Sequence, residues 1–129
     1  MKVSLSNPLR HPLPRVPFSK MKDAVLGTEY ELSVAFVTPQ KMREFNRAHR
    51  RKDMPTDILS FPLSKASGEI FLCMTEVAKK AALFGMTTRQ YLGYVFIHGL
   101  LHLEGCDHGR TMSVLERKFC RALGFPFPS

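Results

Sequence analysis

Residues 91–103, which read YLGYVFIHGLLHL, constrain the fold of this chain more than any other segment. On a helix drawn through them, apolar side chains occupy every side, so that helix needs neighbours all round. At about thirteen residues the segment is shorter than the ~20 needed to span a bilayer. The chain has 129 residues, of which 44% are apolar, and this is enough for one core. We therefore expect one domain built around a buried central helix.

The predicted central helix has a start signal and a stop signal. Thr87 and Gln90 have the spacing of a capping box, in which each side chain bonds the other residue's backbone N–H. Gly105 follows the last apolar residue and can end a helix in the left-handed conformation. The sequence thus predicts a helix that begins after Thr87 and ends near Leu103.

Hydrophobic periodicity predicts further elements on both sides of this helix. Apolar residues at helical spacing indicate helices, and alternating apolar residues indicate strands. Residues 1–17 are rich in proline and are interpreted as an N-terminal arm that precedes the core. The expected helices are 18–27, 41–53, 74–85 and 111–124, and the expected strands are 31–38, 57–63 and 68–74.

Two histidines interrupt the apolar surface of the central helix. His98 and His102 are four residues apart, so both rings leave the helix on one side. Each ring costs about 1 to 3 kcal/mol in an apolar setting unless a partner satisfies it. Backbone carbonyls or a shared metal ion are the alternatives. His108 follows after Gly105, where the chain can turn back and bring a third nitrogen to the same ion.

Three neutral imidazoles with one open position describe a catalytic zinc site, although nickel, cobalt or copper would also bind such ligands. In the zinc protease pattern HExxH, a glutamate that acts as general base follows the first histidine, and here that position is Gly99. The metal would then have to activate water itself, by lowering the pKa of a bound water to about 7. Asp107 either orients a ligand histidine or is a solvated turn residue.

The charge balance favours a polyanionic partner. Nineteen Lys and Arg against eleven Asp and Glu leave a net charge of +8, which suggests nucleic acid first and an anionic membrane surface second. Arg43, Arg47, Arg50 and Arg51 fall on one face of the predicted helix 41–53. The start of the chain has no signal-peptide pattern, and three widely spaced cysteines suit a reducing compartment. We expect a soluble cytoplasmic protein.

Two blocks of the sequence resemble a known family. HGLLHLEGCDH, residues 98–108, is similar to the HGxLHLxGYDH signature of the YbeY family of bacterial rRNA maturation endoribonucleases. NRAHRRKDMPTDILSFP, residues 46–62, resembles that family's N-x-x-Y-R-x-K-D-x-P-T-D-V-L-S-F-P block with every spacing kept. The resemblance covers roughly residues 32–125. The departures are His49 and Cys106 in place of tyrosines, and Glu69 in place of the aspartate of a Gly-Asp-Ile strand signature.

The resemblance implies a single α+β domain over residues 1–129, with one mixed sheet of about four strands packed against helices. It implies one zinc ion per chain, held by His98, His102 and His108, and a functionally important arginine at Arg50. The implied activity is zinc-dependent cleavage of single-stranded RNA in rRNA maturation, including the 16S 3′ end, and in ribosome quality control. Ribosomal RNA precursors and the ribosome or its proteins are then the expected partners, without membrane or DNA.

The chemistry of phosphate binding agrees with the role that the resemblance implies for Arg50, because a guanidinium can hold two nonbridging phosphate oxygens in a planar fork. Its basic neighbours would add attraction that does not depend on sequence. Three other functions stay open at this point. They are a zinc metallopeptidase-like hydrolase, a noncatalytic ribosome-associated RNA-binding module in which zinc only braces the fold, and a metal-free basic RNA-binding domain.

Overall fold

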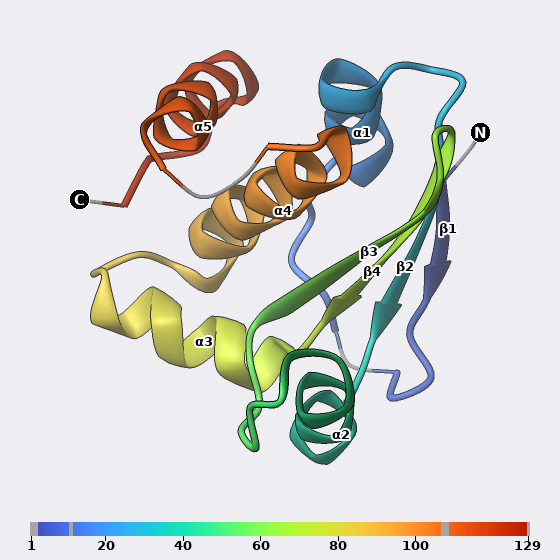
Figure 1. Cartoon of the computed structure of the whole chain (residues 1–129). Coiled ribbons are helices and arrows are strands. Elements are labelled where there is room, and N and C mark those ends of the chain that lie inside the picture. The colour runs from blue at the N-terminus through green and yellow to red at the C-terminus, as the bar shows by residue number, and fades with distance from the viewer. Residues whose placement is uncertain (1–2, 11, 107–108, 129) are drawn as a thin grey trace.

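The computed structural model describes residues 3–10, 12–106 and 109–128. Within these ranges the chain forms one four-stranded sheet and five helices (Figure 1). The predicted α+β class, with a mixed sheet of about four strands, is therefore confirmed. In chain order the elements are β1 (Val3–Ser6), α1 (Phe18–Leu26), β2 (Glu31–Phe36), α2 (Pro39–Arg50), β3 (Ile58–Ser64), β4 (Ser67–Leu72), α3 (Met74–Leu83), α4 (Thr88–Glu104) and α5 (Arg110–Leu123).

The sheet has the strand order β1-β2-β4-β3. β1, β2 and β4 run parallel, and β3 pairs antiparallel with β4 at the edge of the sheet. The expected N-terminal arm is wrong for residues 3–6, because these form β1. This strand is only four residues long, and its backbone partners are Leu32 to Ala35 of β2. Periodicity over so short a segment carries little signal.

Helix α4 occupies the centre of the molecule, as the sequence predicts. It contacts α1, α3, α5 and β3, and its side chains Phe96, Ile97 and Leu100 are completely buried. Figure 1 shows α4 between the sheet and α5, which is the outermost helix on that side. Thr87 and Gln90 form the predicted capping box, and Gly105 ends the helix in the left-handed conformation. Among the described residues, no helix has the length and apolar character needed to cross a membrane.

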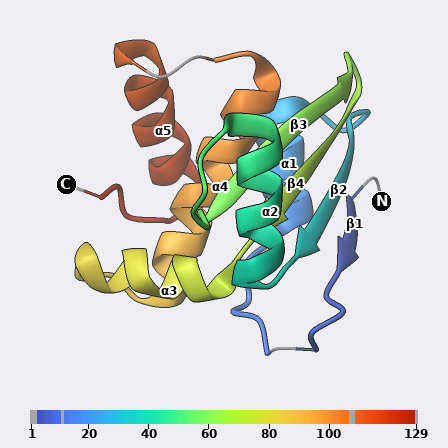
Figure 2. The same cartoon turned by 60° about the horizontal axis from the view of Figure 1, so that its bottom comes forward.

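Helix α2 packs on the opposite face of the sheet (Figure 2), where Met42 forms a small core with Leu59 and Cys73. The helix ends at Arg50, three residues before the predicted end, because Arg51 adopts a left-handed conformation and caps it. Arg51 therefore does not continue the stripe of the other arginines. The side-chain amide of Asn46 is buried and donates to the carbonyl of Met54 at 2.8 Å, which fixes the loop after α2.

Candidate metal and phosphate site

His98 and His102 face each other on α4. Their Nε2 atoms are 3.0 Å apart, and both side chains are half-buried. Two imidazole nitrogens that share a tetrahedral zinc at 2.0–2.1 Å would lie about 3.3 Å apart. The donor set and its spacing therefore fit a transition metal bound by nitrogen.

The third predicted ligand, His108, lies outside the described residues, as does Asp107. Among the residues that the structure does describe, no three His, Cys, Asp or Glu side chains form a group able to hold a metal ion. The predicted zinc site is thus represented here by the pair His98 and His102 alone. Cys106, which stands where the family signature has tyrosine, is half-buried and packs against the core.

Glu116 of α5 orients the first of these histidines. Its carboxylate Oε2 accepts a hydrogen bond from Nδ1 of His98, and the hydroxyl of Tyr94 donates to the same oxygen at 3.5 Å. Glu116 is only 4% exposed, so these bonds replace water for a buried carboxylate. A proton held on Nδ1 leaves the Nε2 lone pair of His98 available to a metal, the arrangement usual for histidine ligands.

The sequence interpretation missed Glu116. It placed Met112, Leu115, Phe119, Ala122 and Leu123 on the inner face of the last helix. All of these except the exposed Ala122 are buried in the core or packed against it, but Glu116 and Cys120 of α5 are buried as well. The available signal was the spacing 112, 116 and 120, which puts a carboxylate in the middle of a buried row. Burial raises the pKa of the Cys120 thiol to about 12, with the nearby Glu116 as the second cause.

Arg50 and the two histidines line one pocket of about 200 Å³. Arg50 comes from the end of α2, the histidines from α4, and the other walls from β3, α3 and the loop before β3. These elements lie far apart in the sequence and meet at the β3 edge of the sheet. The lining residues are Arg50, Thr56, Asp57, Ile58, Ser60, Lys80, Tyr91, Tyr94, Val95, His98 and His102.

A buried hydrogen bond forms one wall of this pocket. The hydroxyl of Tyr91 donates to Oδ2 of Asp57 at 2.6 Å, and Thr56 donates to the other carboxylate oxygen. Burial, and then the bond to Asp57, raise the pKa of Tyr91 far above its ordinary value. Burial also raises the pKa of Tyr94, with Glu116 as the next cause. Both tyrosines therefore stay protonated and act as hydrogen-bond donors.

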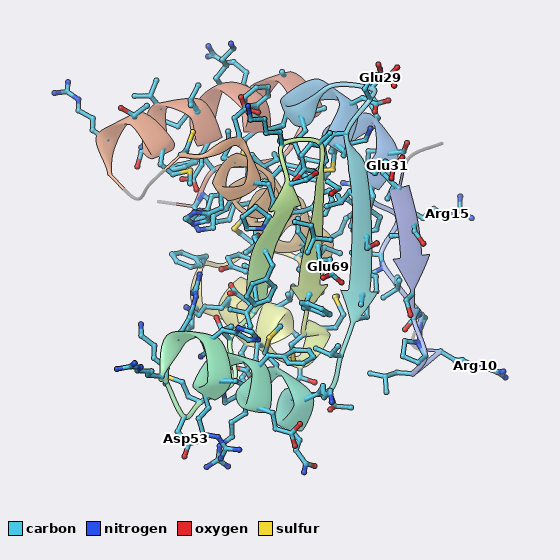
Figure 3. The ribbon with its side chains drawn as sticks, turned by 45° about the vertical axis from the view of Figure 1, so that its right-hand side comes forward. Arg10, Arg15, Glu29, Glu31, Asp53 and Glu69 are labelled. Atoms are coloured by element: carbon cyan, nitrogen blue, oxygen red, sulfur yellow. The ribbon has the colours of Figure 1, made fainter. Side chains whose placement is uncertain are left out.

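The predicted arginine stripe on α2 is divided by Asp53, which lies beside that helix (Figure 3). Arg43 makes two hydrogen bonds to the Asp53 carboxylate, at 2.7 and 2.9 Å, and Arg47 lies 3.8 Å from it. The bond from Arg43 lowers the pKa of Asp53 below its usual range. Arg50 instead lines the same pocket as the two histidines, and Arg43 and Arg47 do not.

Gly99 lies where α4 comes closest to β3. A Cβ atom at this position would lie 2.5 Å from Cδ1 of Ile58 and 2.9 Å from the hydroxyl oxygen of Ser60. That hydroxyl donates to the carbonyl of Gly99 at 3.1 Å. The position that carries glutamate in HExxH proteases therefore has no room for a side chain, which argues against the peptidase alternative.

The fold and the pocket together define an α+β protein in which two histidines of the central helix and an arginine line one pocket. The same fold is found in the solution structure of TM1509 from Thermotoga maritima. That structure aligns with a TM-score of 0.64 and 25% identity, over 94% of this chain and 88% of that one.

A family model described as Endoribonuclease YbeY matches residues 15–122, and the chain belongs to this family. The Endoribonuclease YbeY of Paraburkholderia phytofirmans is 32% identical over 126 residues, which cover 90% of this chain and 82% of that protein. The Neisseria meningitidis serogroup B protein of the same name is 34% identical over 124 residues, covering 81% of this chain and 73% of its own. The resemblance seen in the sequence is therefore confirmed at the level of the family.

Proposed function

We propose that this chain is a zinc-dependent endoribonuclease that cleaves single-stranded RNA in the pocket shared by Arg50, His98 and His102. The observation that carries the proposal is this shared lining, because one small pocket contains both a group that can bind phosphate and two side chains that can bind a metal. The similarity to proteins named Endoribonuclease YbeY supports RNA as the substrate. The net charge of +8 supports a polyanion in general.

In this proposal His98, His102 and His108 hold one zinc ion. When bound, zinc supplies a Lewis acid that activates water near neutral pH. Glu116 keeps the proton of His98 on Nδ1, so that Nε2 points towards the metal. Arg50 binds two nonbridging oxygens of the phosphate and stabilises the negative charge that develops there during cleavage. Tyr91 and Asp57 form a fixed polar wall beside this group.

We propose ribosomal RNA precursors as the substrate, with the ribosome or its proteins as partners in the cytoplasm. This assignment, including the 16S 3′ end and a role in ribosome quality control, rests on the family signature in residues 46–62 and 98–108. Its test is the 3′ end of 16S rRNA in cells that depend on this chain, compared between wild type and a His98→Ala variant. Identical, fully mature ends in both strains would contradict it.

The catalytic role of Arg50 is tested by Arg50→Lys, which keeps the charge and loses the bidentate fork. We expect nearly unchanged binding of single-stranded RNA and at least about tenfold slower cleavage, which corresponds to the loss of about 1.4 kcal/mol in the transition state. The measurement is single-turnover cleavage of a labelled RNA at saturating enzyme, with zinc content checked on the same samples. Cleavage at the wild-type rate would assign Arg50 to general attraction only.

The metal is tested by elemental analysis of protein purified without chelator. We expect about one zinc per chain, and lower occupancy in each of His98→Ala, His102→Ala and His108→Ala. Full zinc content in all three variants would overturn the metal assignment. A folded His98→Ala protein that no longer cleaves, beside a wild type that does, would exclude the noncatalytic module. A zinc-loaded wild type that binds RNA without cleaving it would support that module.

A further inference from the structure

A second basic surface lies on α5, the outermost helix of the α4 side (Figure 1). Residues 110, 114, 117, 118 and 121 share one face of this helix, at spacings of 4, 7, 8 and 11 from the first. All five are exposed, and four of them are cations. The members of this surface are Arg110, Val114, Arg117, Lys118 and Arg121.

Acidic groups do not neutralise this surface in the described part of the chain. The carboxylate of α5 is Glu116, which is buried and bonded to His98 on the inner side of the helix. Among the described residues, no carboxylate forms a salt bridge with the four cations. The α2 stripe differs, because Asp53 holds Arg43 and lies near Arg47. The α5 surface therefore keeps more of its positive charge for an external anion.

Aromatic rings lie among these cations. The Arg117 guanidinium lies 4.2 Å from the centre of the Phe127 ring, and the Lys118 ammonium lies 5.4 Å from that of Phe119. Val114, Arg117 and Arg121 border a groove of about 540 Å³ with Phe125 and Phe127 on its other side. Phe125 is buried, so the ring that a nucleobase could reach is the partly buried Phe127. This ring beside a cationic rim suits a nucleobase whose phosphate meets a guanidinium.

The groove is connected to the candidate site through two rings. Phe127 packs edge-on against Tyr94 with centroids 5.7 Å apart, and Tyr94 lines the pocket that holds His98 and His102. An RNA strand with one phosphate in the pocket therefore needs to pass only the rings of Tyr94 and Phe127 to reach α5. An acidic protein segment would meet the same cations, but the partly buried ring of Phe127 beside them favours a partner with planar bases.

We propose that the groove between α5 and the C-terminal tail is a second RNA-binding surface, which holds single-stranded RNA next to the scissile segment. The proposal takes RNA as its ligand from the proposed function, and it adds a site outside the pocket. It increases affinity for long strands and leaves the chemical step unchanged, because none of its cations lines the pocket.

The test is the binding of labelled single-stranded RNA of about 20 nucleotides to the zinc-loaded full chain over a range of salt concentrations. The variant Arg117→Ala/Arg121→Ala is compared with Lys20→Ala/Lys65→Ala, which removes the same charge from exposed positions elsewhere. We expect at least about tenfold weaker binding in the α5 variant alone. Its salt dependence should flatten by about 1.4 in log–log slope, for two lost phosphate contacts at about 0.7 each.

A second pair of variants guards against an effect on folding. Val114→Glu places a carboxylate in the centre of the α5 surface at a side chain that is 58% exposed, and Leu83→Glu makes the same change on α3 at one that is 78% exposed. Val114→Glu should weaken RNA binding and Leu83→Glu should not. Equal affinities and salt slopes within both pairs would overturn the proposal. If the α5 variants bind RNA as the controls do but bind an acidic peptide more weakly, the surface belongs to a protein partner and the proposal is wrong.

Cleavage on the same samples separates this proposal from the proposed function. Single-turnover cleavage at saturating enzyme should be the same in wild type and Arg117→Ala/Arg121→Ala, while the enzyme concentration needed for half-saturation rises. A wild-type protein that binds RNA through α5 but does not cleave it would contradict the proposed function and leave the second surface standing. A slower saturated rate in the α5 variant would contradict the second surface as stated.

Discussion

At the scale of single residues, the site depends on a buried carboxylate that the sequence did not reveal. The pairing of His98 and His102 could be predicted, because residues four apart on one helix lie on the same side, one turn from each other. The burial of Glu116 has a signal in the spacing 112, 116 and 120, but its bond to His98 could not be predicted, since His98 is 18 residues away on a different helix. Burying an ionised carboxylate is costly unless hydrogen bonds satisfy it, and here a histidine and the Tyr94 hydroxyl supply them.

Replacing Glu116 with glutamine should therefore weaken zinc binding more than folding. Glu116→Gln keeps the shape but removes the acceptor charge that holds the proton on Nδ1 of His98. We expect about 10- to 100-fold weaker zinc affinity, the usual cost of losing such a partner. Competition with a chromogenic chelator measures this affinity. Glu104→Gln at the exposed end of α4 is the control, and equal affinities in the two variants would contradict the role given to Glu116.

At the scale of elements, the central helix could be predicted from the sequence and the first strand could not. An all-apolar segment with a capping box and a terminal glycine identifies α4 by local signals alone. β1 has no comparable local signal, because its place beside β2 is set by tertiary pairing. The close approach of α4 to β3 at Gly99 was likewise invisible, since it depends on how the two elements meet.

A side chain added at Gly99 should disturb the packing of α4 on β3. Gly99→Ala places a methyl group against side-chain atoms of Ile58 and Ser60. Ile58 is buried and the Ser60 hydroxyl bonds the Gly99 carbonyl, so moving these side chains aside costs packing or a hydrogen bond. Alanine is the better helix former, so propensity alone would stabilise the variant by about 1 kcal/mol. We expect overpacking to exceed this gain and a net loss of about 1 to 2 kcal/mol in the free energy of unfolding, measured by urea.

The matched control for that experiment is Ala82→Gly on α3, an exposed helical position where only propensity changes. It should lose about 1 kcal/mol. A Gly99→Ala protein more stable than wild type would show that α4 and β3 can separate here, and the steric argument against an HExxH-type base would fail with it.

Asp53 pairs with two arginines of the stripe on helix α2, Arg43 and Arg47. Asp53→Asn should release Arg43 and Arg47 for RNA, because the asparagine side chain keeps the shape without the charge. We expect tighter binding of single-stranded RNA and a steeper salt dependence, by up to about 1.4 in log–log slope for two added contacts. Fluorescence anisotropy at several salt concentrations measures both. Glu44→Gln removes the same charge from α2 beside Lys41, and an equal gain there would reduce the effect to net charge.

At the scale of the whole molecule, the candidate site joins parts of the chain that lie far apart in the sequence and are brought together by the packing around α4. Arg50 ends α2, the histidines belong to α4, and Glu116 comes from α5. The site therefore needs the complete fold, which is why composition and periodicity could indicate its members but not their distances. A metal held here would bind the folded chain and hardly the unfolded one, so its binding energy would add to stability.

Zinc should accordingly stabilise the protein against heat, and the effect should vanish in acid. At a free zinc concentration of about 100 times the dissociation constant, the gain is about 2.7 kcal/mol. For a domain of this size we expect the melting temperature to rise by several degrees. Protons compete with the metal for the imidazole nitrogens. The stability that zinc adds should therefore be fully present above about pH 6.5, the ordinary range of histidine, and be lost as the pH falls below that value.

The measurement is thermal unfolding with zinc or with chelator at about pH 7.5 and about pH 5, values that lie on either side of the ordinary histidine pKa. His102→Ala is the control, because it removes one of the paired nitrogens at a half-buried position. The wild type should show a zinc-dependent shift at the higher pH that is smaller at the lower pH, and the variant should show much less at either. A shift of equal size in the wild type and in His102→Ala would mean that zinc binds elsewhere. The paired histidines would then be polar groups of the core and not ligands, and what holds them in an otherwise apolar helix would be the bond of His98 to Glu116 and the contact between the two rings.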